Sequence, residues 1–194
     1  MMKMSKGIIY SNNKGLSLKE LAPEDKEAFD DLLCEETELM KCDDIRDYYY
    51  ETLHKVICFY MLSDEGIDQF IGYICITPHE DEAPEIGIYL SPDYRGKGIA
   101  IEFLPKAMEY YSKMNDVPFF IYKTRANNIA SQKVAKALGA IKMEDEGNTL
   151  HERLIALSEE LKPEIREEFL SEFVKDYNPE SERVIRFRID IKTK

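Results

Sequence analysis

The residues best suited to chemistry form a short junction, RGKG at 95–98, where a β-type run gives way to a helical pattern. Gly96 and Gly98 let the backbone turn with exposed N–H groups and no Cβ in the way. Those amides and the positive end of the following helix dipole are a typical pocket for an anion. Arg95 and Lys97 add mobile positive charge. The junction predicts a phosphate-binding loop, with a surface turn carrying incidental cations as the alternative.

Two better-known phosphate loops do not fit this junction. A P-loop places Lys and then Ser or Thr after its second glycine, whereas Gly98 is followed by Ile99. A dinucleotide fingerprint that begins at Gly96 requires Gly or Ala at its sixth position, which is Ile101 here. The strands before the junction also look antiparallel, which does not suit a βαβ unit.

The elements that must position this loop follow from hydrophobic periodicity and turn residues. Strands are expected at 15–21, 55–62, 68–77, 83–90, 118–124, 141–147 and 183–191. Helices are expected at about 23–36, 43–54, 98–113 and 127–140. Short, turn-rich connections between 55 and 90 predict an antiparallel meander. The helix at 98–113 places apolar residues through Met114 toward a core, and Pro105 should bend it.

The predicted fold is a mixed α/β (α+β) domain that covers residues 1–194, with a mostly antiparallel central sheet flanked by helices. A helical insertion at about 146–182 precedes the last strand, because leucines and aromatic residues recur there at helical spacing. This acidic insertion could cap an acceptor site, form a homodimer seam, or pack on its own domain.

Charge and composition narrow the classes of partner. The 194 residues contain 38 Asp and Glu against 26 Lys and Arg, a net charge of −12. That balance argues against nucleic-acid binding and suits a cationic partner such as an amine. No apolar run approaches the roughly 20 residues that span a bilayer, so a soluble, cytoplasmic protein without membrane contact is expected. No metal is expected, because the cysteines lack CxxC spacing and His79 has no second histidine at ligand spacing.

The motifs resemble a known family. Residues 95–100, RGKGIA, are similar to the R/Q-x-x-G-x-G/A signature of the GNAT N-acetyltransferase superfamily. Asn128, with Ser131 three residues later and Gly139 eleven residues later, resembles that family's later N-x-x-S/A…G segment. The opening LSLKELAPEDKEAF resembles the first strand and helix of its ribosomal-protein N-acetyltransferase subgroup. The resemblance covers about 15–145 and the last strand.

The resemblance implies a binding mode for acetyl-CoA. The strands at 83–90 and 118–124 would splay apart around the pantetheine arm, whose amides would pair with the backbone of Ile88, Tyr89 and Leu90. Asn128 and Ser131 would also lie at the cofactor, while helix capping is a second role for Asn128 that is compatible with the first. The residues implied for the pyrophosphate are Arg95, Gly96, Lys97, Gly98, Ile99 and Ala100.

The resemblance also implies direct attack of a neutral amine on the thioester. Glu85 stands where many family members place the base that deprotonates the amine, with Glu80, Asp81 and Glu82 as rivals. The family often uses a Tyr seven residues after the Asn as the acid, and this chain has Ala135 there. Tyr122 or Tyr89 could substitute, or the CoA thiolate could leave without an acid.

The function expected is therefore that of an acetyl-CoA-dependent N-acetyltransferase acting on a primary amine of a small molecule, peptide or protein. The alternatives are a non-catalytic acyl-CoA-binding module, which the departure at Ala135 favours, and an acyltransferase that uses a longer acyl chain. The sequence carries no readable code for the acceptor.

Overall fold

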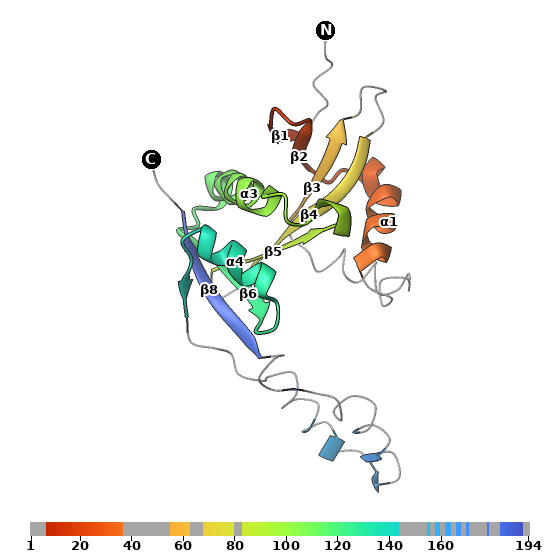
Figure 1. The fold of residues 1–194 in the computed structure, drawn as a ribbon, viewed down its shortest axis with the longest axis vertical. Coiled ribbons are helices and arrows are strands. Elements are labelled where there is room, and N and C mark those ends of the chain that lie inside the picture. The colour runs from red at the N-terminus through yellow and green to blue at the C-terminus, as the bar shows by residue number, and fades with distance from the viewer. Residues whose placement is uncertain are drawn as a thin grey trace. The chain divides into compact units, whose positions relative to one another are not determined.

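A computed structural model of the chain describes residues 7–36, 55–62, 68–79, 83–143 and 183–191, with isolated positions between 155 and 178. The predicted helix at 43–54 lies outside the described residues, as does most of the insertion at 146–182. The described strands and helices are β1 (Ile8–Ser11), β2 (Leu16–Glu20), α1 (Lys26–Glu36), β3 (Lys55–Leu62), β4 (Asp68–Thr77), β5 (Glu85–Leu90), α3 (Ile99–Asn115), β6 (Phe119–Arg125), α4 (Ile129–Ala137), β7 (Ile141–Lys142) and β8 (Val184–Asp190) (Figure 1).

The chain divides into two compact units, residues 1–121 with 189–194, and residues 122–188. We call them unit 1 and unit 2. The prediction of one domain over 1–194 stays a prediction.

The strands of unit 1 from β1 through β5 are antiparallel neighbours, and the meander predicted between residues 55 and 90 is confirmed in β3, β4 and β5. Leu16 and Leu18 of β2 are buried, as the sequence suggests, but Ser17 between them is buried too, so burial does not alternate along this strand. β1 is not among the predicted elements, because its apolar run is too short to predict a strand by itself. Its pairing with β2 (Tyr10 opposite Leu18) provides the ladder hydrogen bonds that a four-residue strand requires.

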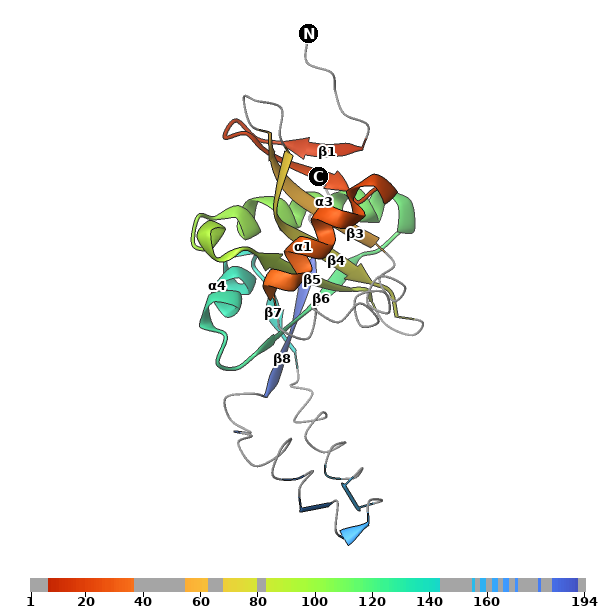
Figure 2. The same cartoon turned by 90° about the vertical axis from the view of Figure 1, so that its right-hand side faces the viewer.

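Helices α1 and α3 lie on opposite faces of this sheet (Figures 1 and 2). A short 3₁₀ turn at Pro23–Asp25 leads into α1, and the carboxylate of Asp25 accepts a hydrogen bond from the Ala22 amide at 2.9 Å. The predicted apolar residues of α1 are all buried, namely Phe29, Leu32 and Leu33. Together with Tyr73 and Tyr89 they form one cluster of the core.

The apolar stripe of α3 is buried from Ile99 to Tyr111, as its spacing predicts. The expectation for Met114 was wrong, because its side chain is 54% exposed. Met114 belongs to the last turn of the helix, immediately before Asp116 takes the left-handed conformation that ends it. The apolar spacing therefore continues to the end of α3, but the side chain of Met114 lies beyond the part of the helix that packs on the core.

β5 and β6 run parallel and share one register pair, Glu85 opposite Ile121, both in unit 1. The amide of Ile121 donates to the Pro84 carbonyl at 3.0 Å. The boundary between the two units falls immediately after this pair. The parallel contact at one end of β5 makes the sheet mixed, as expected.

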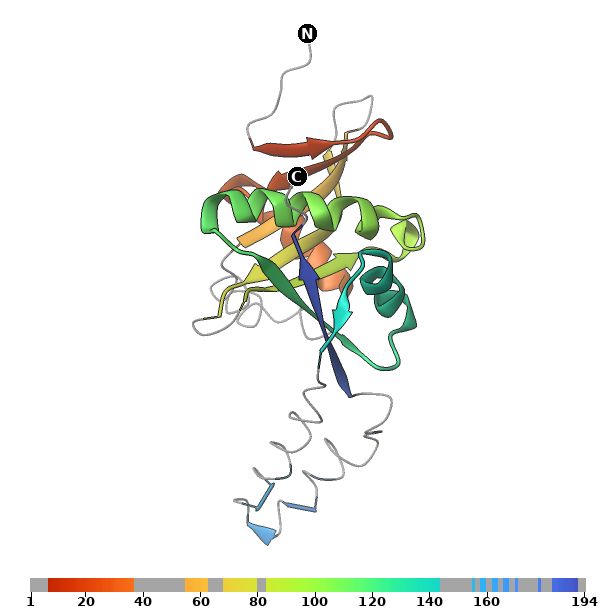
Figure 3. The ribbon, with the colours of Figure 1, turned by 90° about the vertical axis from the view of Figure 1, so that its left-hand side faces the viewer.

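Unit 2 consists of the end of β6, α4, β7 and most of β8. In it β8 pairs antiparallel with β7, with Ile141 opposite Arg188 (Figure 3). The Ala126 amide at the end of β6 donates to the Arg183 carbonyl at 2.8 Å. Among the described residues, no helix is long and apolar enough to cross a membrane.

Candidate functional site

The loop between β5 and α3, residues 95–100, has the backbone geometry of an anion pocket. Gly96 and Gly98 have φ of +72° and +80°, the left-handed region that favours glycine. A Cβ built on either glycine meets nothing within 4 Å. Gly98 caps α3 with no side-chain hydrogen bond, and the first helical bond runs from the Glu102 amide to the Gly98 carbonyl. The amides ahead of Glu102 therefore form an uncapped, positive helix terminus.

The two cations of this loop lie over aromatic rings. The Arg95 Nε donates to the Leu90 carbonyl at 2.8 Å, and its guanidinium carbon is 5.6 Å from the centroid of the Tyr89 ring. The Lys97 Nζ is 5.1 Å from the centroid of the Tyr94 ring. Both contacts are in the range of cation–π attraction. Both side chains are exposed, and their mobility stays a prediction.

The backbone of β5 has one edge occupied and one edge open. Towards β4, Ile88 pairs with Ile74, Tyr89 with Tyr73, and Leu90 with Gly72. On the other edge, the pairing among the described residues of unit 1 is confined to Glu85. Peptide groups later in β5 therefore have no strand partner on that side within this unit. Such an edge can accept a ligand that carries amides in extended conformation.

Glu85, the predicted base, begins β5 opposite Thr77. Its Oε2 is 3.7 Å from the Nε2 of His79, two residues beyond Thr77. Both side chains are part exposed. The sequence does not predict this contact, because it depends on the register of β4 and β5, which is not visible in sequence spacing. The rival acids Glu80, Asp81 and Glu82 lie outside the described residues.

Three predicted residues of unit 2 form one hydrogen-bonded group. The Tyr122 hydroxyl and the Ser131 Oγ are 2.7 Å apart, and the Ser131 amide donates to the Asn128 Oδ1 at 3.0 Å. Asn128 is the N-cap of α4, which confirms its capping role. Burial raises the pKa of the Tyr122 hydroxyl, and the hydrogen bond with Ser131 offsets part of this shift. Tyr122 is 4% exposed and so stays protonated at neutral pH.

Ala135, where the resemblance implies a tyrosine, is fully buried. It is the buried residue of α4, on a helix whose other side chains are exposed or half-buried. A tyrosine at this fully buried position would have to displace neighbouring atoms, so the position suits a small side chain such as alanine.

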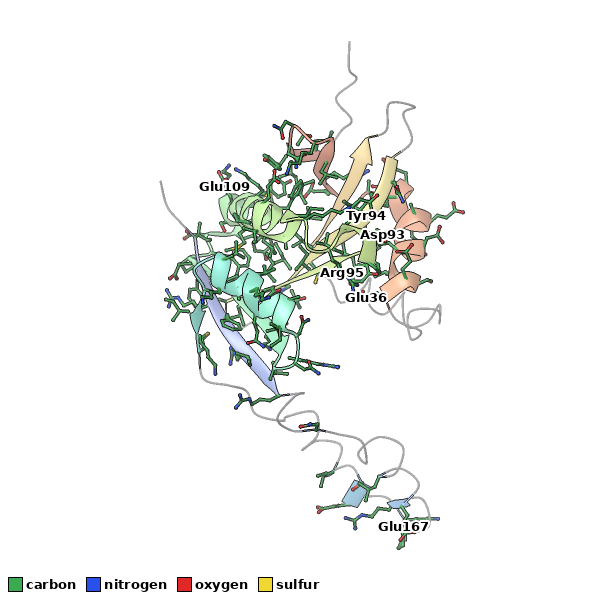
Figure 4. The ribbon with its side chains drawn as sticks, in the orientation of Figure 1. Glu36, Asp93, Tyr94, Arg95, Glu109 and Glu167 are labelled. Carbon is green, nitrogen blue, oxygen red and sulfur yellow. The ribbon has the colours of Figure 1, made fainter. Side chains whose placement is uncertain are left out.

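In unit 1, Glu85 lies at the start of β5 and the 95–100 loop follows the other end of that strand. In unit 2, the structure brings Tyr122, Asn128 and Ser131 together. Their roles remain predictions. Sequence reasoning missed a carboxylate beside the loop, Glu36 at the end of α1, which is labelled with Arg95 in Figure 4. Among the described residues, no group of three His, Cys, Asp or Glu side chains could hold a metal ion.

Comparisons with known proteins agree with this architecture. The model of a family described as an acetyltransferase (GNAT) domain matches residues 16–141, from β2 to β7. No curated protein sequence matches the chain.

Three solved structures of similar fold have TM-scores of 0.60 or more. RimL, a ribosomal L7/L12 α-N-protein acetyltransferase in complex with coenzyme A, has 16% identity and a TM-score of 0.66, with coverage of 96% of this chain and 99% of that chain. The ribosomal-protein-S5-alanine acetyltransferase from Vibrio fischeri has 13% identity and 0.61, with 94% and 96% covered. The spermidine N-acetyltransferase from Vibrio cholerae in complex with CoA and spermine has 15% identity and 0.60, with 92% and 97% covered. Since the family match spans more than half of the sequence, the chain belongs to the GNAT acetyltransferase family.

Proposed function

We propose that this protein transfers an acetyl group from acetyl-CoA to a primary amine of a small molecule, peptide or protein. The observation that carries the proposal is the uncapped N-terminus of α3, preceded by two glycines at positive φ with open space around them. A pyrophosphate suits this terminus, because successive amides and the helix dipole both favour an anion. Acetyl-CoA would supply the activated thioester. The backbone amides of the 95–100 loop would bind its pyrophosphate, and the edge of β5 from Ile88 to Leu90 would bind the pantetheine amides.

The chemistry required of the chain is one acyl transfer. The amine nitrogen forms a C–N bond with the thioester carbonyl carbon as the C–S bond breaks. A β5 amide next to that carbonyl would stabilise the oxyanion, which needs only fixed geometry. Glu85 would accept the proton of the amine, and Tyr122 would donate one to the departing sulfur. Burial raises the pKa of the Tyr122 hydroxyl, which keeps it protonated at neutral pH, as a proton donor must be, and also makes it a weaker acid.

The acceptor class rests on charge and on the similar proteins. The net charge of −12 favours a cationic acceptor. The similar enzymes are named for acetylation of ribosomal proteins and of spermidine. Both kinds of acceptor present a primary amine, and we propose a primary amine as the acceptor of this chain. We also propose that the protein acts in the cytoplasm.

The direct test is calorimetric titration of the purified protein with acetyl-CoA, with CoA alone as the control, followed by turnover with spermidine and with peptides that have a free N-terminal amine. We expect micromolar binding, about 8 kcal/mol, and release of CoA thiol when an amine is present. Binding without turnover would favour the non-catalytic acyl-CoA-binding module, for which the buried Ala135 is the specific observation. Competition of longer acyl-CoA donors with acetyl-CoA tests the remaining alternative, an acyltransferase that uses a longer acyl chain. Absence of binding would contradict the proposal.

Glu85→Gln tests the base. The variant should lower kcat/KM by about 10²- to 10⁴-fold at neutral pH, the usual contribution of a positioned base. The loss should shrink as pH rises, because a growing fraction of the amine is then already neutral. Glu109→Gln is the matched control, since Glu109 is an exposed carboxylate on α3 paired with Lys113. A Glu85→Gln profile parallel to that of the wild type at every pH would remove Glu85 from this role.

A further inference from the structure

Four side chains connect the end of α1 to the 95–100 loop through two strands of unit 1. The Tyr73 hydroxyl of β4 donates to the Glu36 Oε2 at 2.5 Å. The Tyr73 ring lies 5.7 Å from that of Tyr89 on β5, and the Tyr89 ring lies under the Arg95 guanidinium. We call Glu36, Tyr73, Tyr89 and Arg95 the Glu36–Arg95 cluster; Figure 4 shows its two ends, Glu36 and Arg95, where α1 meets the loop.

The charges of the cluster are interdependent. Burial raises the pKa of the Glu36 carboxyl, and the Tyr73 hydrogen bond and the charge of Arg95 offset part of that rise. Burial also raises the pKa of Tyr89. The charge of Arg95 lowers this pKa, and the charges of Glu35 and Glu36 raise it further. Glu35 is itself held by the Ser91 hydroxyl at 3.0 Å. Arg95 is therefore a cation that acts on the half-buried Glu36 carboxylate of α1.

The geometry of Arg95 restricts what its side chain can do. The hydrogen bond from Nε to the Leu90 carbonyl fixes the plane of the guanidinium against β5, and the Tyr89 ring lies beneath it. An arginine held in this manner is pre-organised by the protein. Lys97 differs, since its contact is with Tyr94 and leads to no carboxylate of α1.

We propose that Arg95 is a positioning residue whose guanidinium transmits the ionisation of Glu36 to the backbone of the 95–100 loop. Its influence on the donor is exerted through the loop amides, and Lys97 is the cation that attracts phosphate. This inference rests on the proposed function only for its donor, because the coupling between Glu36 and the loop exists in the protein alone. Donor affinity should therefore fall when Glu36 is neutral. If Arg95 instead bound phosphate directly, Glu36 and phosphate would compete for its charge, and a neutral Glu36 would make donor binding tighter.

The donor-free test is an NMR titration of the full-length protein with labelled Glu carboxyl carbons and backbone amides. In the wild type, the Gly96 and Gly98 amide shifts should titrate with the midpoint of Glu36. Glu36→Gln should abolish this component, and Arg95→Gln should raise the Glu36 midpoint and uncouple the glycines. Lys97→Gln is the matched control and should leave both unchanged. The proposal would be overturned if the glycine amide shifts did not change with pH at the Glu36 midpoint, or if Arg95→Gln left the Glu36 midpoint unchanged. Either result holds whether or not the chain binds acetyl-CoA.

The donor-dependent test compares acetyl-CoA affinities. Arg95→Gln and Glu36→Gln should each weaken binding about tenfold, the size expected of one charge-assisted hydrogen bond. Arg95→Lys should be as weak as Arg95→Gln, because lysine cannot reproduce the planar contact and the Leu90 hydrogen bond. Affinity preserved in Arg95→Lys, or tighter binding by Glu36→Gln, would make Arg95 a direct phosphate ligand. Failure of the wild type to bind any acetyl-CoA would overturn the proposed function, and the NMR titration would still decide the coupling.

Discussion

At the scale of single residues, the most constrained position of the candidate site is Gly98. Its φ of +80° is unfavourable for any residue with a Cβ, although the space around it is open. The constraint is thus conformational, and a side chain there would also enter the space in front of the α3 terminus. Gly139 offers a comparison, with φ of +74° and the same open surroundings at the end of α4.

Gly98→Val should cost about 1–2 kcal/mol of stability through backbone strain and should reduce acetyl-CoA affinity by more than tenfold. Gly139→Val carries the same kind of strain away from the loop. It should show a similar loss of stability with donor affinity unchanged. Thermal unfolding and calorimetric titration of both variants measure the two effects separately. Equal affinities of Gly98→Val and wild type would argue against the loop as the donor site.

At the scale of elements, α3 combines a buried stripe with a proline that helices rarely contain. Pro105 lies on the exposed side, between the buried residues Leu104 and Ala107. It supplies no amide to the Ile101 carbonyl. The apolar stripe nevertheless maintains one helix from Ile99 to Asn115, because tertiary packing provides most of a helix's stability.

Pro105→Ala should therefore raise the free energy of unfolding by about 1–3 kcal/mol, since it restores a backbone hydrogen bond and a favourable helical residue. Glu109→Ala, on the same exposed side, should change it by less than about 0.5 kcal/mol, because its partner is an exposed lysine. Chemical denaturation of both variants provides the measurement. Destabilisation by Pro105→Ala would show that the proline shapes the packing of α3.

At the scale of the whole molecule, stability depends on pH through many carboxylates, and Glu36 opposes the general trend. Most acidic side chains in folded proteins are stabilised in the charged form. Glu36 has a pKa above its ordinary value of 4.5, because burial disfavours its charge. For such an acid the folded state binds the proton more tightly than the unfolded state does. Its contribution to stability is complete below the unfolded pKa and is lost as pH rises through the folded pKa.

Glu36→Gln should remove this loss. We expect the variant to gain stability relative to the wild type as pH rises from about 4 to 7, since the amide oxygen can still accept the Tyr73 hydrogen bond. Unfolding midpoints across this pH range, with Glu109→Gln as the control, measure the difference. If the stability of the wild type instead rose relative to that of the variant towards neutral pH, Glu36 would be stabilised as an anion. Higher stability together with weaker donor binding would be the trade-off expected of a functional carboxylate.

The sequence by itself determined the elements whose information is local. β-rich runs bounded by turn residues predicted β2 to β5, and helical spacing predicted α1 and most of α3. Two glycines before a helix predicted exposed amides at 96–98. Each of these patterns is contained within one turn or one strand, so the chemistry of a few neighbouring residues decides it. Family motifs then indicated the donor and the class of reaction, although not the acceptor.

Only the tertiary structure decided the contacts that connect distant parts of the chain. Glu36 meets Tyr73 because α1 packs across β4, and Arg95 lies over Tyr89 because the loop turns back on β5. His79 reaches Glu85 through the register of β4 and β5, and β1 exists through its pairing with β2. Such contacts depend on the relative placement of whole elements. No spacing along the sequence encodes that placement, because packing and strand register select it from many pairings that are equally compatible with the local pattern.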